Sequence, residues 1–382
     1  MTTALAFVQR TPAMKTVMRE DAVDALGAEL ALLRVQRVLL VCGGSVRRSA
    51  LHGRVLRQLE AMDVLQADDV PAHSSVALVE RLARQAVERG IEAVVAVGGG
   101  SSSDTAKAVV LLMAEGGRLA DHASRFTPPA QLHVPVLTRP KIPIVTIPCT
   151  ASGAEVTPSL GIRDAEGRKL LFTDPQLASR VVLLDAKANL AVPAGLMLST
   201  GMNGLAHCIE GLYSKERSPL AELLAIDALQ RFARALPAVH AAPGDVAARG
   251  ELLYAAHLSG LVLVNARTCL HHAVCHAIGS VTGAPHGEAN AVLLPHALRF
   301  NREAVRPALA QASAAIGGGD FIEWLEALAL GLGVPRRLRD IGVAQDSLER
   351  IAHKTMGERG LYFNPRPVQD AGEILGLLQQ AF

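Results

Sequence analysis

The N-terminal half of the chain alternates short, continuously apolar runs with longer segments of helical periodicity. The apolar runs are "RVLLVC", "IEAVVAV", "KIPIVTI" and "RVVLLD". Between them, segments such as 76–90 and 101–114 carry apolar residues three and four positions apart, as amphipathic helices do. Strands that are apolar throughout and separated by helices are typical of a parallel sheet covered on both faces. We therefore predict an α/β domain over residues 1–187.

The pattern changes near Pro193, after which apolar residues recur at helical spacing to the end of the chain. "AGLMLSTGMNGLAHCIEGLYS" and "DVAARGELLYAAHLSGLVLVNA" illustrate this periodicity. We predict an all-α domain over residues 188–382. Ligands of α/β sheets bind beyond the carboxyl ends of the strands, so the helical domain is expected to close that crevice.

Composition narrows the classes of function. The 38 Lys and Arg nearly balance the 36 Asp and Glu, and aromatic residues are 3%, which argues against a nucleic-acid-binding face. The five cysteines show no Cys-x-x-Cys spacing, as expected in a reducing compartment. No apolar run reaches about 18 residues without charge, and the N-terminus has no cleavage-site pattern. We expect a cytoplasmic protein without nucleic-acid or membrane partners.

The segment "VGGGSSSDTAKA" follows a predicted strand and opens a predicted helix. Gly98, Gly99 and Gly100 let the backbone approach a ligand closely, and the N–H groups at a helix start suit a pyrophosphate. The polar residues that follow are expected to cap the helix; they are Ser101, Ser102, Ser103 and Asp104. Of these, Ser101, Ser102 and Asp104 are also expected to contact the cofactor. A plain strand-to-helix turn has the same pattern, and the segment is not the Gly-x-Gly-x-x-Gly fingerprint.

Candidate chemistry is concentrated in the helical half. Asn203 and His207 lie four residues apart and are predicted to share one helical face. "LHHAVCHAIGSVTGAPHG" then carries four more imidazoles, His271, His272, His276 and His286. Core or capping histidines are the ordinary explanation for single residues of this type, whereas a cluster indicates a metal site or an acid–base site.

Three segments together resemble the iron-containing (group III) alcohol dehydrogenases. They are "GGGSSSDTAKA", "MNGLAHCIEGLYS" and "HHAVCHAIG…APHGEANAVLLPHALRFN", in the order and spacing of that family, and the resemblance covers nearly the whole chain. It implies a nicotinamide-dependent oxidoreductase that has an N-terminal dinucleotide-binding domain and a C-terminal helical domain and is usually a homodimer.

The resemblance also implies a set of site residues. In the family, an Asp and three His hold a divalent metal, usually iron. His207, His272 and His286 match the three histidines, whereas Asn203 occupies the position of the Asp. His276 matches a family active-site histidine that is not a ligand.

One branch of the family carries this Asn, the maleylacetate reductases, which as a group look metal-independent. "LHHAVCH" and the short loop "PCTASGAEVTP" are similar to that branch, whereas "HGEANAVLLPH" is more similar to the iron dehydrogenases. Residues of the short loop and of the strand beyond it are expected to contact the cofactor; they are Cys149, Thr150, Ser152 and Lys169.

The chemistry of the ligands favours a site without metal. A hard divalent cation prefers an anionic oxygen beside neutral imidazoles, and Asn203 offers a neutral carbonyl. Glu210, one turn after His207, replaces that charge only if it points into the same cavity. We expect a metal-free acid–base cluster; the other possibility is a weakened iron or zinc site. The cluster comprises Asn203, His207, His272, His276 and His286.

Maleylacetate reduction requires acid–base groups of this kind. The substrate is a conjugated enone with two carboxylates; hydride adds to the alkene, and the resulting enolate needs stabilisation and a proton. Imidazoles supply both, whereas simple alcohol oxidation gains more from a metal. Arg267, His271 and Lys169 are the candidate cations for the carboxylates.

The end of the first long apolar run bears on the choice of nicotinamide. In many relatives that strand ends in an Asp that repels a 2′-phosphate, and here Gly43 stands at the position, followed by Ser45 and Arg47. Removing the carboxylate removes the repulsion, and Arg or Ser can bind the phosphate. We expect NADPH, with or without NADH, as the cofactor.

Three other functions stay open at this stage. They are an iron- or zinc-dependent alcohol dehydrogenase, a lyase of the dehydroquinate-synthase type and a non-catalytic binding protein. Detection of a bound metal would distinguish the alcohol dehydrogenase from a metal-free reductase. The lyase would show no net consumption of NAD(P)H. The glycine loop and the four family-matched histidines argue against the binding protein.

Overall fold

The computed structural model describes residues 7–72, 74–128 and 131–382. A six-stranded sheet forms the centre of the N-terminal half, and every pair of neighbouring strands is parallel. Across the sheet the strands are β1 (Lys15–Arg19), β10 (Val181–Asp185), β7 (Ile144–Pro148), β4 (Ala93–Gly98), β2 (Arg37–Cys42) and β3 (Asp63–Ala67).

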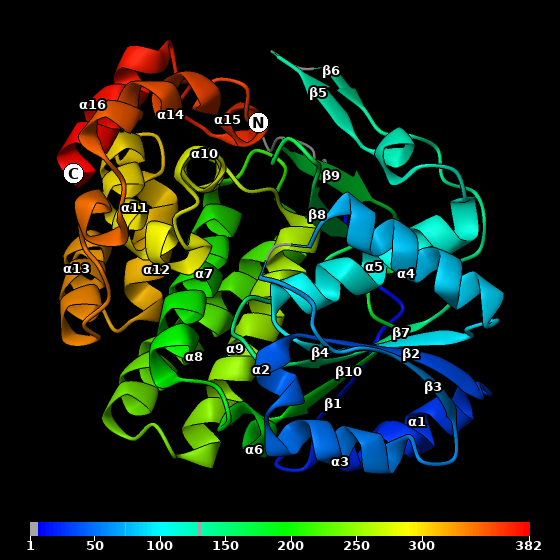
Figure 1. The fold of residues 1–382 in the computed structure, drawn as a ribbon. Helices are drawn as coiled ribbons and strands as arrows, with labels where there is room; N and C mark the ends of the chain where they lie inside the picture. Colours follow the sequence, from blue (N-terminus) through cyan, green and yellow to red (C-terminus); the bar gives the residue numbers. More distant parts are fainter. Residues whose placement is uncertain (1–6, 73, 129–130) are drawn as a thin grey trace.

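The central strands are buried on both faces because helices cover each side. Val95 of β4 lies opposite Leu40 of β2 and Val145 of β7, and all three are fully buried. Helices α4 (Val76–Glu88) and α5 (Gly100–Glu115) cover one face, and α1 (Leu26–Leu32) and α3 (Ala50–Gln58) cover the other (Figure 1). The predicted α/β fold is confirmed, since continuous apolar runs suit strands that never face water.

Helices make up the second half, as predicted. They are α7 (Ala194–Tyr213), α8 (Pro219–Ala241), α9 (Val246–Asn265), α10 (Leu270–Thr282), α11 (His286–Asn301), α12 (Arg306–Ala315), α13 (Phe321–Gly331), α14 (Leu348–Thr355), α15 (Gly360–Phe363) and α16 (Ala371–Ala381). Helix α7 is buried along most of its length and packs against α8, α9 and α11. Within the described residues, no helix combines the length and the apolar character needed to cross a membrane.

Two short helices and two hairpins lie outside these layers. Helix α2 (Gly44–Arg47) follows β2, and α6 (Ala186–Asn189) follows β10. The hairpins are β5 (Arg125–Thr127) with β6 (Gln131–His133), and β8 (Ser159–Arg163) with β9 (Lys169–Thr173). The predicted domain boundary at 187/188 falls inside α6, which bridges the two halves: Asn189 donates to the Cys149 carbonyl (2.8 Å) and accepts from Arg249 (3.2 Å).

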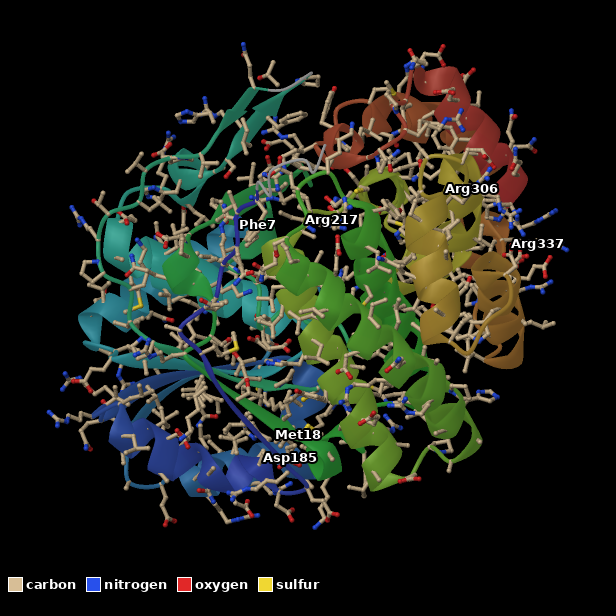
Figure 2. All side chains as sticks on the ribbon, turned by 180° about the vertical axis from the view of Figure 1, so that it is seen from behind. Phe7, Met18, Asp185, Arg217, Arg306 and Arg337 are labelled. Carbon is tan, nitrogen blue, oxygen red and sulfur yellow. The ribbon has the colours of Figure 1, made fainter. Side chains whose placement is uncertain are left out.

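Two buried charged side chains in the sheet half, Asp185 and Lys141, have partners of opposite charge. Asp185, at the end of β10, accepts from the backbone N–H groups of Val23 (2.9 Å) and Ala188 (2.6 Å) and contacts Arg54 at 3.2 Å. Figure 2 shows Asp185 beside Met18, on the neighbouring strand β1. The buried Lys141 ammonium lies 3.0 Å from the carboxylate of Asp174. These pairs compensate the loss of hydration that burial imposes on each charge.

Candidate active site

Two loops at the carboxyl ends of β4 and β7 form a backbone cradle. Gly98 has φ of 139°, and a Cβ there would lie 2.6 Å from the hydroxyl of Ser102. A Cβ on Gly99 would approach Thr150 to 3.0 Å, and the Cys149 N–H donates to the Gly98 carbonyl at 2.8 Å. Gly98 therefore requires glycine, and the absence of a side chain on Gly99 keeps room beside Thr150. This geometry fits the pyrophosphate of a dinucleotide at the start of α5.

The predicted capping of this helix is wrong. Gly99 is the N-cap, the helix begins at Gly100, and no side chain caps it. Ser101 instead donates to the Ala72 carbonyl, and Asp104 accepts from the Gly161 N–H at 3.1 Å. Because the polar residues lie inside the first turn, they hold neighbouring loops. The N–H groups that precede them are left without side-chain caps and suit a bound anion.

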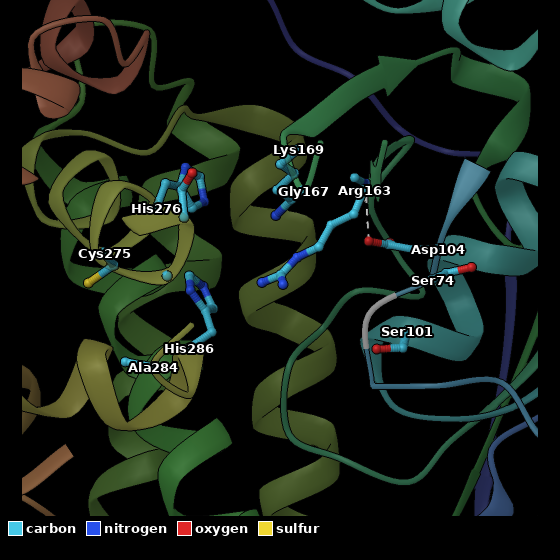
Figure 3. Close-up of a pocket in the computed structure, with 13 residues that line it drawn as sticks. Ser74, Ser101, Asp104, Arg163, Gly167, Lys169, Cys275, His276, Ala284 and His286 are labelled. Carbon is cyan, nitrogen blue, oxygen red and sulfur yellow. Dashed lines mark hydrogen bonds between the residues drawn. The ribbon is translucent and has the colours of Figure 1, made fainter. Parts of the chain in front are cut away.

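A cleft between the two halves begins at this loop (Figure 3). Ser101 and Asp104 lie on one wall, His276 and His286 lie on the other, and Arg163 and Lys169 reach into the space between. A Cβ on Gly161 would overlap the Lys169 side chain, so this glycine sets the path of the lysine across the hairpin. The structure thus brings Lys169 together with the predicted cofactor loop.

A larger cavity, of about 750 Å³, lies next to this cleft, and all four family-matched histidines line it. They are His207, His272, His276 and His286. His276 and His286 line the cleft as well, so their rings stand between the two spaces. The volume is in the usual range for small-molecule sites.

Asn203 and His207 share one face of α7, as predicted, and both are buried. The Nε2 atom of His272 lies 3.2 Å from Oδ1 of Asn203, and its Nδ1 atom lies 2.6 Å from Oε2 of Glu210. The rings of His207 and His272 stack with centroids 4.8 Å apart. Asn203 and Glu210 therefore contact opposite nitrogen atoms of the His272 ring.

Burial determines the charge of this cluster. It lowers the pKa of His207 well below the ordinary value, and neighbouring imidazoles act in the same direction. Burial also lowers the pKa of His272 and raises the pKa of Glu210, which disfavours the charged form of each. His276 is half-buried, with its side chain 30% exposed, and its Nδ1 atom lies 3.5 Å from a carboxylate oxygen of Glu358. His286, at the start of α11, is exposed.

The structure contradicts one predicted substrate contact. His271 is fully buried and lines neither space. Its Nε2 atom lies 3.0 Å from the Asn290 carbonyl, and burial lowers its pKa to about 4. A neutral imidazole enclosed in this way does not bind a substrate carboxylate. The doubled His therefore has one member in the cavity and one in the core.

The donor set does not suit a hard divalent cation. Among the described residues, Glu210, His271 and His272 have ligand atoms within 4.8 Å of one another, but hydrogen bonds within the core already join them. At the family's ligand position, Asn203 offers a neutral oxygen. Glu210 does not replace the missing charge, because it contacts the Nδ1 side of His272, away from Asn203.

The segment after β2, predicted to select the nicotinamide, contacts an acid that sequence reasoning missed. Gly43 is the N-cap of α2, which contains Ser45 and Arg47. The Arg47 guanidinium lies 3.2 Å from a carboxylate oxygen of Asp68, directly after β3. An acidic residue immediately after a parallel strand was the available signal.

Other functional candidates had no local signal. Arg267 lines the larger cavity, in agreement with the prediction, and Arg10 and Arg359 join it there. Arg163 in the cleft and Glu358 beside His276 were also missed. These residues come from the N-terminal segment, a hairpin and the turn before α15, and tertiary packing alone brings them together.

Comparisons with known proteins agree with this geometry. The chain matches the profiles described as "Iron-containing alcohol dehydrogenase" over residues 13–186 and "Fe-containing alcohol dehydrogenase family, C-terminal" over residues 197–382. A maleylacetate reductase of Sphingobium indicum is 34% identical over 309 residues, 81% of this chain and 79% of that protein. A maleylacetate reductase structure from Agrobacterium tumefaciens has a TM-score of 0.85 at 29% identity, covering 99% of this chain and 98% of that one. A 1,3-propanediol oxidoreductase structure reaches 0.92 at 27% identity, covering 99% and 100%.

Proposed function

The chain belongs to the iron-containing alcohol dehydrogenase family and is an NAD(P)H-dependent oxidoreductase, and we propose that it reduces maleylacetate or a closely related acidic enone to a 3-oxoadipate-type product. The observation that carries this substrate class is the histidine cavity. It combines imidazoles with arginines suited to carboxylates, and the neutral Asn203, in place of a metal-binding acid, contacts His272 of the cavity wall.

The residues of the chain divide the work of this reaction. NAD(P)H, when bound on the glycine loop, supplies the hydride that adds to the alkene. His276 holds a proton at Nε2 and delivers it to carbon, while Glu358 orients the ring through Nδ1. The buried His207 remains neutral and polar beside the developing enolate oxygen, and His286 lies on the same cavity wall. Arg267 binds a carboxylate.

The same proposal makes the reaction independent of metal, because the donor set lacks an anionic oxygen. The test follows loss of reduced-nicotinamide absorbance with maleylacetate, using chelator-treated protein and metal-supplemented protein in parallel. Equal, rapid turnover in both samples supports the proposal. Turnover of simple alcohols or aldehydes that appears only with Fe²⁺ or Zn²⁺ would instead establish a metal-dependent dehydrogenase, the function favoured by the fold similarity to 1,3-propanediol oxidoreductase.

We propose NADPH as a cofactor, with or without NADH. Gly43 leaves the end of β2 without a carboxylate, and Arg47 is available to a 2′-phosphate. Asp68 now pairs with Arg47, so a phosphate would compete with this carboxylate. Replacing Asp68 by Asn is expected to raise kcat/KM with NADPH relative to NADH; an unchanged ratio would place 2′-phosphate recognition elsewhere.

The working form in this proposal is a cytoplasmic homodimer that acts on a small acidic or carbonyl substrate and has no nucleic-acid or membrane partner. The support is the family resemblance and the balanced charge. Light scattering on the purified protein, with and without cofactor, measures the mass directly and tests the dimer.

A further inference from the structure

Three arginines from distant parts of the chain line the cavity that holds the histidines. Arg10 lies in the segment before β1, Arg267 lies between α9 and α10, and Arg359 is the N-cap of α15. They share this wall with His276, whose ring also lines the cofactor cleft. Three guanidinium groups therefore gather in the space where the substrate must meet the cofactor.

Buried contacts fix the backbone of each arginine. The side chain of Asn265, which is 2% exposed, accepts from the Arg10 N–H at 2.7 Å and donates to the Arg10 carbonyl at 2.8 Å. Helix α15 follows Arg359 and packs on the segment that follows Arg267: the Cys269 thiol lies 3.4 Å from the Phe363 carbonyl. The three arginines are thus attached to one another through the core and are not on independent loops.

The positive charges of this group have no ion-pair partner among the described residues, although the carboxylates of Glu216 and Glu358 partly offset those of Arg267 and Arg359. Among the described residues, none of the three forms an ion pair within 4.0 Å, whereas Arg54, Arg231 and Arg366 each do. Burial first, and then the positive charges of Arg359 and Arg10, lower the pKa of Arg267. Like charges brought together at a half-buried position raise the free energy of the unliganded protein, and an anion between them relieves that repulsion.

We propose that Arg10, Arg267 and Arg359 form a subsite for the substrate carboxylate that is remote from the reacting double bond. This inference rests on the proposed reductase function and makes a dicarboxylate, rather than any enone, the preferred substrate class. Guanidinium forks bind carboxylates bidentately, and a cavity of about 750 Å³ has room for a six-carbon diacid. Arg359 is a specificity residue in this proposal, and His276 is left to protonate the substrate carbon.

Calorimetric binding of adipate and hexanoate to the full-length protein, saturated with oxidised cofactor, tests the subsite without any turnover. The two acids have the same carbon chain and differ by one carboxylate. R359Q and R267Q are expected to weaken adipate binding roughly 10- to 100-fold and leave hexanoate binding nearly unchanged. R359K is expected to recover part of the loss. R337Q, at an exposed arginine outside the cavity, is the matched control and should bind both acids as the wild type does.

Two results would overturn the subsite: wild-type protein that binds adipate no better than hexanoate, or correctly folded R359Q and R267Q that retain wild-type affinity for adipate. The thermal midpoint of each variant establishes that it is folded. Maleylacetate turnover is measured separately. Selective adipate binding without maleylacetate reduction refutes the proposed function and leaves the subsite intact, whereas reduction with adipate affinity unaffected by both variants refutes the subsite alone.

Discussion

Buried ionisable side chains in the two halves of the molecule have different partners. In the sheet half, Asp185 and Lys141 lie beside side chains of opposite charge, and Asp185 also accepts from backbone N–H groups. In the helical half, burial lowers the pKa of His207, His271 and His272, which disfavours the charged form of each imidazole.

The buried ion pairs serve stability, whereas the buried imidazoles can take part in proton transfer. A buried ion pair keeps its protonation state, because protonating or deprotonating one partner would leave the other as an uncompensated charge away from water. A neutral imidazole can accept, donate or relay a proton without such a penalty. The sheet half therefore provides a rigid platform for the cofactor loop, and the helical half provides the groups that can change during a reaction.

The largest effect is expected for His276, which lines both the cleft and the larger cavity. His276→Ala removes the proposed proton donor, so kcat with maleylacetate should fall by about 10²- to 10⁴-fold. The unfolding midpoint should change little, because the side chain is 30% exposed. Steady-state kinetics with chemical denaturation measures both quantities. His353→Ala, in the last turn of α14 and exposed, is the control. A loss in kcat below about threefold would assign the proton to another group.

Asp185→Ala should lower stability and leave catalysis nearly unchanged. It leaves Arg54 and two buried backbone N–H groups without their carboxylate partner, so the free energy of unfolding should fall by about 3 kcal/mol with kcat nearly unchanged. Asp24→Ala removes a more exposed contact to the same arginine and should cost less than about 1 kcal/mol. Equal losses in urea titrations of the two variants would contradict the contrast between paired and solvated charge.

Acid should destabilise the helical half through His271. Its pKa is about 4 in the folded protein and 6.5 when unperturbed, so the unfolded chain binds more protons between these values. Its contribution to stability is complete above pH 6.5 and decreases as the pH falls, by about 2 kcal/mol at pH 5. Urea titrations from pH 8 to pH 5 should show a shallower decline for His271→Asn than for the wild type. Parallel declines would mean that this imidazole is not held neutral.

A smaller effect is expected for Lys169, the sheet-half lysine that lines the cleft with His276 and His286. Gly161→Ala would displace the Lys169 side chain from the cleft, so KM for the nicotinamide cofactor should rise about fivefold, near 1 kcal/mol. Gly195→Ala, where a Cβ meets nothing within 4 Å, is the matched control. Unchanged cofactor KM in Gly161→Ala would remove Lys169 from cofactor binding.

Local sequence patterns predicted the strands and helices better than they predicted which distant residues meet at the site. Continuous apolar runs specify the parallel sheet because their side chains have no exposed face to encode. The glycine loop was recognisable, yet its serines were expected to cap α5, because propensity does not distinguish an N-cap from a first-turn residue that bonds to another loop. Arg10 and Arg359 had no periodic or motif signal, since only tertiary packing places them beside Arg267.

The position of His276 and His286 between the two spaces has a kinetic consequence. Among the described lining residues, the cofactor cleft and the larger cavity have only these two in common. The nucleotide can therefore reach these two histidines through the cleft and the organic substrate can reach them through the cavity. Neither ligand blocks the binding of the other. Initial rates at varied concentrations of both reactants should obey a random-order rate law, and a dead-end diacid should compete with the organic reactant while remaining noncompetitive toward the nucleotide.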